Sequence, residues 1–139
     1  MKKIITLLIA VMAVACVNAQ TKGSKSSFTE AGTLYVYGLS YSASDSVVYI
    51  TDLLMLNNAQ MTKRTNFLVN RHELSAQLTK YMSSQGMQHY TSCIVFRKNL
   101  NKIDKDYQNT VEKLKKRGFL IKNIDQTKFR FETVREDEE

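Results

Sequence analysis

The sequence of 139 residues contains no proline and no tryptophan, and it has only two histidines and two cysteines. Without proline, no turn depends on a cis prolyl bond or on slow prolyl isomerisation. So few histidines and cysteines cannot form a cluster with the ligand spacing of a zinc site. Glycine-rich phosphate-binding loops and Gly-x-Ser-x-Gly elbows are also absent. We therefore predict no catalytic residue, no metal site and no cofactor.

The first twenty residues have the pattern of an export signal. Lys2 and Lys3 precede an apolar run of 14 residues, Ile4–Val17, and Asn18 and Ala19 follow it. A basic start, a short hydrophobic centre and small residues before the cut are what translocation and signal peptidase require. A helix needs about 20 apolar residues to cross a bilayer. We therefore predict that residues 1–19 are removed, and that the mature chain is periplasmic or secreted and has no transmembrane helix.

A competing interpretation places a lipoprotein signal at the same end of the chain. In that case Ala13-Val14-Ala15-Cys16 is the processing site, and lipidated Cys16 tethers the mature chain to a membrane. The position three before Cys16 holds alanine rather than the usual leucine, so cleavage after Ala19 fits better. Lipid anchoring at Cys16 stays open as the alternative.

Removal of residues 1–19 leaves 18 basic and 13 acidic residues, a net charge of +5, and a single cysteine, Cys93. No intramolecular disulfide can form, so stability must come from the burial of apolar surface. A mature chain of about 120 residues suits one domain. We predict a flexible leader at 20–32, a single domain at 33–134 and a solvated acidic tail at 135–139.

Branched and aromatic residues predict several short strands. Residues 34–41 and 47–56 have this composition, and the small polar residues 42–46 between them favour a turn, so we expect a hairpin. Further strands are predicted at 67–69, 91–96, 119–124 and 129–132.

Two helices are predicted between these strands. The first opens with Asn70 and Glu73, which have the spacing of a capping arrangement, and stops before Gly86. The second covers residues 100–117, where apolar residues recur at steps of three and four, and Gly118 follows it.

This order of elements predicts an α+β fold. Two helices cannot cover both faces of a small sheet, so we expect a two-layer sandwich with a four- to five-stranded mixed sheet and two helices on one face. The strands at 91–96 and 119–124 are expected to run parallel, joined by the second helix as a crossover.

Tyrosines gather on one side of the first predicted strand. The period of two places Tyr35, Tyr37 and Tyr41 on the same face, and Tyr49 follows in the next strand. An aromatic ring with a polar tip can stack on sugars, peptides or bases, so we take Tyr35, Tyr37 and Tyr41 as candidate binding residues. The alternative is that these rings pack under the helices.

Basic residues crowd the end of the second predicted helix. Lys113, Lys116 and Arg117 are candidate contacts for an anionic surface such as lipid head groups. Cations at this end also complement the helix dipole, so a solvated basic face is the alternative, and the acidic tail could fold back onto it. Outside the cytoplasm we expect no nucleic acid partner.

The lone thiol and the histidines suggest no site by their spacing. Cys93 lies four residues after His89 but inside an apolar strand, where a free cysteine usually acts as a small hydrophobic residue. His72 and Glu73 are neighbours on a helix and diverge by about 100°, which suits neither a metal nor a proton relay. A hydrolase or thiol enzyme whose residues meet only in the folded chain stays the alternative.

Several segments together resemble a known group of proteins. They are the signal ending in Asn18-Ala19-Gln20, the hairpin of 34–41 and 47–52, the segment 67–73 and the terminal Phe129-Arg130-Phe131-Glu132. They are similar to uncharacterised small exported proteins of Bacteroides-type bacteria. The resemblance implies a cell-envelope location and carries no activity or site. We predict an exported envelope module that binds an unknown envelope protein or small ligand, with an enzyme or a lipid-anchored scaffold as alternatives.

Overall fold

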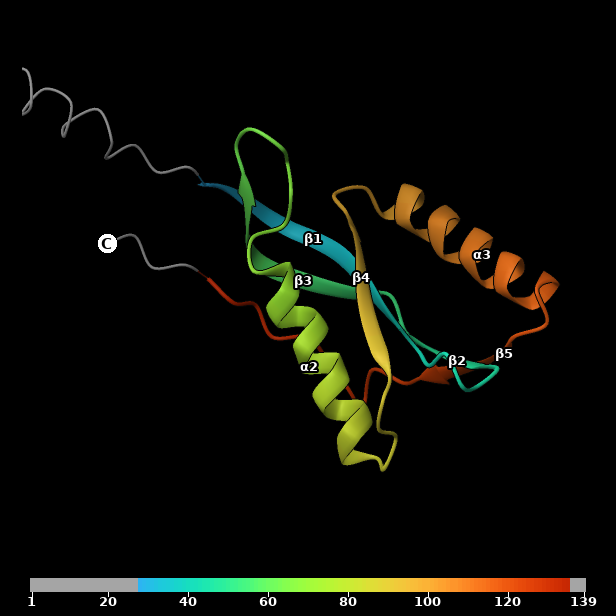
Figure 1. Cartoon of the computed structure of the whole chain (residues 1–139). Coiled ribbons are helices and arrows are strands. Elements are labelled where there is room, and N and C mark those ends of the chain that lie inside the picture. The colour runs from blue at the N-terminus through green and yellow to red at the C-terminus, as the bar shows by residue number, and fades with distance from the viewer. Residues whose placement is uncertain (1–27, 136–139) are drawn as a thin grey trace, which may run out of the picture.

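The computed structural model describes residues 28–135 of the chain. Its elements follow in the order β1 (Phe28–Tyr41), β2 (Val47–Thr51), β3 (Leu54–Thr62), α2 (Arg71–Ser84), β4 (Thr91–Arg97), α3 (Leu100–Lys116) and β5 (Leu120–Ile124), as Figure 1 shows. The predicted signal peptide, the lipidation site at Cys16, residues 20–27 of the predicted leader and residues 136–139 of the predicted tail lie outside the described residues.

The long strand β1 is the centre of a five-stranded mixed sheet. Along one edge, β4 pairs antiparallel with β1 from Tyr35↔Arg97 to Tyr41↔Thr91. Along the other edge, β1 pairs antiparallel with β3 through its first part and with β2 through its last three residues. β5 then pairs with β2 in parallel. Because β2 and β4 both run opposite to β1, β4 and β5 are parallel as predicted, with β1 and β2 between them.

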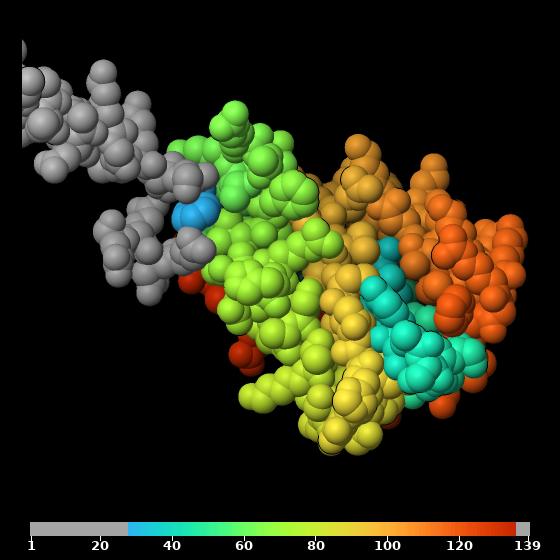
Figure 2. Space-filling view, viewed as in Figure 1, coloured from blue at the N-terminus to red at the C-terminus, as the bar shows by residue number. Residues whose placement is uncertain are grey.

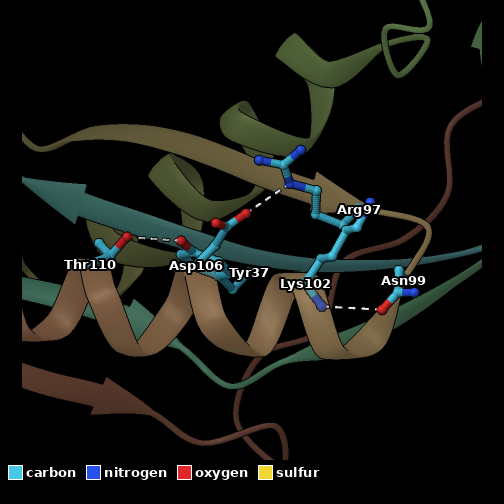
Figure 3. Close-up of polar contacts among 6 residues, drawn as sticks. All are labelled: Tyr37, Arg97, Asn99, Lys102, Asp106 and Thr110. Atoms are coloured by element: carbon cyan, nitrogen blue, oxygen red, sulfur yellow. Dashed lines mark hydrogen bonds and ion pairs between the residues drawn. The ribbon is translucent and has the colours of Figure 1, made fainter.

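The two helices lie on opposite faces of this sheet. Successive residues of a strand point to opposite faces. A Cβ atom at Gly38 of β1 would contact Leu78 of α2, whereas the neighbouring Tyr37 packs on Tyr107 of α3. In Figure 3 the sheet accordingly passes between α3 and α2.

The α+β class, the mixed sheet and the two helices are confirmed, but the placement of both helices on one face is corrected. The physical reason is the composition of β1. Val36 is buried on the α2 side and Tyr37 on the α3 side, so each face of the strand carries apolar surface that needs its own cover.

The face under α2 holds the larger core. Leu74, Leu78 and Met82 recur at steps of four along α2 and are buried there against residues of β1, β3 and β4. The chain that follows β5 covers the remainder of this face with the buried Phe131 and the half-buried Phe129. Helix α2 and this segment therefore share one side of the sheet.

Two of the predicted short strands are not strands. Residues 129–132 alternate as a strand would, but Gln77 of α2 takes their main-chain groups: its Nε2 donates to the carbonyl oxygen of Glu132 at 2.9 Å, and its Oε1 accepts from the amide of Glu132 at 2.9 Å. Residues 67–69 make only a single bridge, between Leu68 and Met61. Residue 132 is thus bound by a helix distant in the sequence, whereas the bridge of Leu68 joins residues only seven positions apart.

The predicted boundaries of the domain also shift. β1 begins at Phe28, so residues 28–32 of the predicted leader are part of the sheet. Arg135, which the sequence placed in the acidic tail, donates to Glu30 at 2.5 Å and to the carbonyl oxygen of Asn58 at 3.0 Å. These contacts fasten Arg135 to the start of β1 and to β3.

Helix α2 begins after Asn70, as predicted, but without the predicted capping arrangement. Asn70 has a left-handed backbone, φ 56° and ψ 30°, and its side chain makes no cap hydrogen bond. Asparagine tolerates this conformation. The amide of Glu73 donates instead to the carbonyl oxygen of Asn70 at 3.0 Å, and the Glu73 carboxylate lies 3.2 Å from His72.

Helix α3 covers the opposite face. Ile103 is fully buried and packs with Tyr37 and Ile50. The side chain of Asn99 accepts a hydrogen bond from the amide of Lys102 at 3.2 Å and so caps the start of the helix (Figure 3). Neither α2 nor α3, the helices of the described region, is long and apolar enough to cross a membrane.

Candidate functional site

The three candidate tyrosines share one face of β1 but differ in exposure. Tyr37 is only 1 % exposed, Tyr35 is half-buried, and Tyr41 is 46 % exposed. The hypothesis of an open tyrosine face is corrected at Tyr37, because α3 covers it. Tyr41, at the end of β1, is the tyrosine of this group that solvent reaches most easily.

Tyr37 anchors α3 to the sheet. Its ring lies edge to face with Tyr107, with the ring centroids 5.2 Å apart, and its hydroxyl shares a hydrogen bond of 3.1 Å with Thr110 (Figure 3). Burial raises the pKa of Tyr37, so the phenol stays neutral. Arg97 of β4 also donates to Asp106 of α3 at 2.8 Å. These contacts fix the middle turns of α3 against β1 and β4.

A pocket of about 390 Å³ lies between the hairpin turn and the C-terminal end of α3. Figure 2 shows the turquoise hairpin beside the orange end of α3 on the molecular surface. The strands, the turn and the helix all contribute to the lining, which consists of Leu39, Tyr41, Ser42, Ala43, Asp45, Val48, Thr110, Leu114, Arg117 and Phe119. The fold thus brings together Tyr41 and Arg117, two of the six candidate residues, which lie far apart in the sequence.

The chain after α3 holds the hairpin turn at this position. Gly118 has φ 88°, a conformation that glycine adopts without steric cost, and it lets the chain leave the helix and enter β5 at once. The amide of Leu120 then donates to the carbonyl oxygen of Ser46 at 2.9 Å. One side of the pocket is therefore tied to the other through β5.

The three candidate cations of α3 have different surroundings. Lys116 forms an exposed ion pair with Glu112, in which Nζ and Oε1 are 2.9 Å apart. Lys113 is exposed and does not line the pocket. Arg117 lines the pocket and has no acidic partner within residues 28–135. Only Arg117 of the three places a cation beside the apolar lining.

The predicted fold-back of the acidic tail onto this basic cluster rests on residues 136–139, which lie outside the described residues. Arg135, the first residue of the predicted tail, is bound to Glu30 near the start of β1, whereas Tyr41 and Arg117 line the pocket at the other end of this strand.

Asp45 is the acidic residue of the pocket lining, and both of its carboxylate oxygens already accept hydrogen bonds. One carboxylate oxygen accepts from the Tyr90 hydroxyl at 2.6 Å and the other from the amide of Val47 at 3.3 Å. The bond from Tyr90 lowers the pKa of Asp45 below its ordinary value, and the same bond raises the pKa of Tyr90 to about 12. Asp45 is therefore ionised at neutral pH and engaged with donors on its own side of the pocket.

Replacing Asp45 by asparagine is expected to return the pKa of Tyr90 from about 12 toward its ordinary value of 10.0, because the carboxylate holds the phenol proton. The raised pKa stabilises the folded state below about pH 10, and this contribution is lost as the pH rises toward 12. The lowered pKa of Asp45 has the corresponding effect at low pH. It stabilises the folded state above the ordinary carboxyl pKa, and this stabilisation is lost as the pH falls through the pKa that Asp45 has in the folded state. Phenolate absorbance against pH measures the tyrosine titration, and Tyr90→Phe identifies the Tyr90 component. An unchanged titration in Asp45→Asn would contradict the bond.

Cys93 is half-buried on β4, and burial raises the pKa of its thiol. A raised pKa leaves less of the reactive thiolate. Across residues 28–135, no hydrogen bond joins the thiol to His89, which lies in the loop before β4. The same region contains no group of three or more histidine, cysteine, aspartate or glutamate side chains that could hold a metal ion.

A second depression, of about 350 Å³, lies beside β3 and the chain after β5. Its lining mixes apolar residues such as Leu53 and Met55 with Asn57, Gln126 and Arg130. It includes none of the six candidate residues. The pocket beside Tyr41 is therefore the candidate site, because its lining includes two of the residues that the sequence predicted as binding residues.

The apolar residues of this pocket could not be recognised as a site from the sequence. The predicted elements place Leu39 and Val48 in strands, Leu114 in the second helix and Phe119 at the start of a strand. No local pattern shows that they converge, because convergence depends on the parallel pairing of β5 with β2. A pattern that runs from Leu39 to Phe119, 80 positions along the chain, carries no short-range signal.

Comparisons of the chain with models of protein families, with curated proteins and with solved structures found no match. The fold and the pocket themselves define the class: a small α+β sandwich with a helix on each face and an apolar pocket beside an arginine.

Proposed function

We propose that this chain is an exported cell-envelope protein that binds a small, mainly apolar ligand in the pocket between the β1–β2 turn and α3. Export rests on the sequence pattern of Lys2, Lys3 and the apolar run that follows them. The observation that carries the binding proposal is the pocket itself, in which side chains from two strands, a turn and a helix surround about 390 Å³.

The size and composition of the pocket support a small-molecule ligand. Pockets that hold small ligands usually measure about 300–1,000 Å³ and combine apolar walls with a few polar groups. Here Leu39, Val48, Leu114 and Phe119 supply apolar contact, while Thr110 and Arg117 supply polar groups. Burial of apolar ligand surface contributes about 25 cal/mol per Å², so a lining of this kind favours an apolar ligand body.

The rigidity of the surrounding elements also supports the proposal. Tyr37 and Arg97 fasten α3 to the sheet, and Leu120 fastens the turn to β5. A preformed site loses less conformational entropy when the ligand binds. Tyr41, which is nearly half exposed, supplies an aromatic wall at the solvent side.

Filling the pocket should weaken binding. Ala43 is an exposed residue of the turn that lines the pocket, so Ala43→Trp would occupy it without disturbing the buried core. With the neutral apolar fluorophore N-phenyl-1-naphthylamine as probe, we expect the wild-type chain to enhance the fluorescence on titration. We expect Ala43→Trp to raise the Kd obtained from this titration about tenfold, the effect of losing roughly 1.4 kcal/mol of binding free energy.

Ala76→Trp is the matched control. Ala76 is also an exposed alanine, but it lies on α2, on the other face of the sheet, and does not line the pocket. Its replacement adds the same ring and should leave the fluorescence enhancement unchanged. Equal effects of the two tryptophans, or no enhancement by the wild-type chain, would contradict the proposed site.

A further inference from the structure

We infer that the ligand of this pocket is a single-chain amphiphile with a carboxylate head, held by Arg117 at the head and by the apolar lining along the chain. This inference rests on the proposed function, since it names the chemical class of ligand for the same pocket. Three observations carry it: the position of Arg117, the pairing of the other nearby charges, and the distribution of apolar residues.

The first observation is that Arg117 lacks a counter-charge among the described residues. Two other arginines of the described region pair with carboxylates: Arg97 with Asp106, and Arg135 with Glu30. Arg117 lines the pocket without such a partner. A guanidinium at the edge of an apolar pocket favours an anionic group on the ligand, because charge-assisted hydrogen bonds to carboxylates are stronger than neutral ones.

The second observation is that Asp45, the acidic residue of the lining, does not compete for Arg117. Its two oxygens already accept from Tyr90 and from the amide of Val47. The nearby Lys122 also acts on Asp45 and lowers its pKa. The ligand head can therefore bind the guanidinium of Arg117, because the carboxylate of Asp45 already accepts hydrogen bonds from Tyr90 and Val47.

The third observation is that apolar residues from both α3 and the strands line the pocket together with Arg117. Leu114 and Phe119 flank it along the chain, while Leu39 and Val48 come from β1 and β2. A ligand whose head lies on Arg117 can thus place its body on the strands. A carboxylate suits one guanidinium, because the two planar groups form two parallel hydrogen bonds and carry equal and opposite charge.

The experiment compares decanoate with decan-1-ol, which have the same chain length and differ in the charge of the head group. Isothermal titration calorimetry with the purified chain measures both affinities. We expect decanoate to bind about tenfold more tightly than decan-1-ol, and Arg117→Gln to remove this difference, because a hydrogen bond to a charged group contributes roughly a factor of ten or more. Arg117→Gln should weaken the binding of decanoate by a larger factor than the binding of decan-1-ol, because only decanoate loses a charged partner.

Lys115→Gln is the matched control variant. Lys115 lies on the same turns of α3 and carries the same charge, but it does not line this pocket. It should bind both ligands as the wild-type chain does. If Lys115→Gln weakens decanoate binding as much as Arg117→Gln does, the anion is held by the general basic surface of α3, and the inference is overturned.

The remaining outcomes separate the inference from the proposed function. If the two ligands bind equally and Ala43→Trp blocks both, the proposed apolar binding site is retained, but the inference that the ligand has a carboxylate head is overturned. Absence of binding by both ligands would overturn the inference together with the proposed site. Binding of the chain to vesicles of anionic phospholipid with no binding of free decanoate would also overturn it, in favour of a membrane surface.

Discussion

Ile103→Ala is expected to lower the free energy of unfolding by about 3 kcal/mol, within the range measured for large-to-small changes in protein cores. Ile103 is fully buried and packs with Tyr37 and Ile50, at the centre of the contact between α3 and the sheet. Truncation removes apolar contact and leaves a cavity that the flanking rings fill poorly. Urea denaturation followed by circular dichroism measures the change.

Leu100→Ala provides the control within the same helix. Leu100 is the first residue of α3 and is 48 % exposed, so its truncation should change the free energy of unfolding by less than about 1 kcal/mol. Equal losses from the two variants would contradict the placement of α3 on this face. Such a result would also remove the basis of the pocket, because Thr110, Leu114 and Arg117 reach it only when α3 is docked.

The elements with strong periodicity could be predicted from the sequence alone. The apolar stripes of α2 and α3 and the aromatic run of β1 appear at the predicted places, within a few residues of the predicted bounds apart from the earlier start of β1. These signals are local, because one face of a helix or strand is specified by residues that lie close together in the chain. Gly86 and Gly118 likewise follow the helices that they were predicted to end.

The faces of the sheet could have been assigned better from the same sequence. Residues 34–39 of β1 are apolar or aromatic at every position except Gly38, and the apolar run of β4 is equally continuous. A strand with one solvated face alternates, whereas a strand buried on both faces does not. The lack of alternation was therefore a signal that helices cover both sides of the sheet.

Other features depend on contacts between residues far apart in the sequence. Asp52 separates β2 from β3, and its carboxylate accepts hydrogen bonds from Asn123 at 2.8 Å and from the amide of Gln126 at 2.9 Å. Gln77 similarly binds both main-chain groups of Glu132. Because no local pattern specifies such partners, the break between β2 and β3 and the irregular chain after β5 could not be predicted.

The pocket depends both on local sequence patterns and on contacts between residues far apart in the sequence. Tyr41 and Arg117 were candidates because of their residue types and neighbours, but their proximity results from the docking of α3 and the pairing of β5 with β2. The site therefore depends on the correct packing of α3 against the sheet. Loss of that packing in Ile103→Ala should weaken ligand binding as well as stability.

Gly38→Ala is expected to lower the free energy of unfolding by about 2 kcal/mol, which tests the packing of the opposite face. Gly38 is buried in β1, and a Cβ atom there would lie 2.6 Å from Cδ2 of Leu78, 2.9 Å from Cζ of Phe131 and 3.4 Å from Cδ1 of Ile94. The first two distances are shorter than van der Waals contact, so the buried side chains of Leu78 and Phe131 must shift to make room for the new methyl group. The reduced entropy of the unfolded chain offsets only about 0.4–1 kcal/mol of this cost.

A double variant identifies the clash as the cause. Leu78→Val removes the Cδ atoms nearest to the new methyl group and on its own should cost about 1 kcal/mol. If α2 packs directly on Gly38, the two changes together should destabilise the chain by about 1 kcal/mol less than the sum of the single variants, since residues in contact couple by this amount. Strict additivity in urea denaturation, or a Gly38→Ala variant as stable as the wild-type chain, would show that Leu78 does not close this face of the sheet.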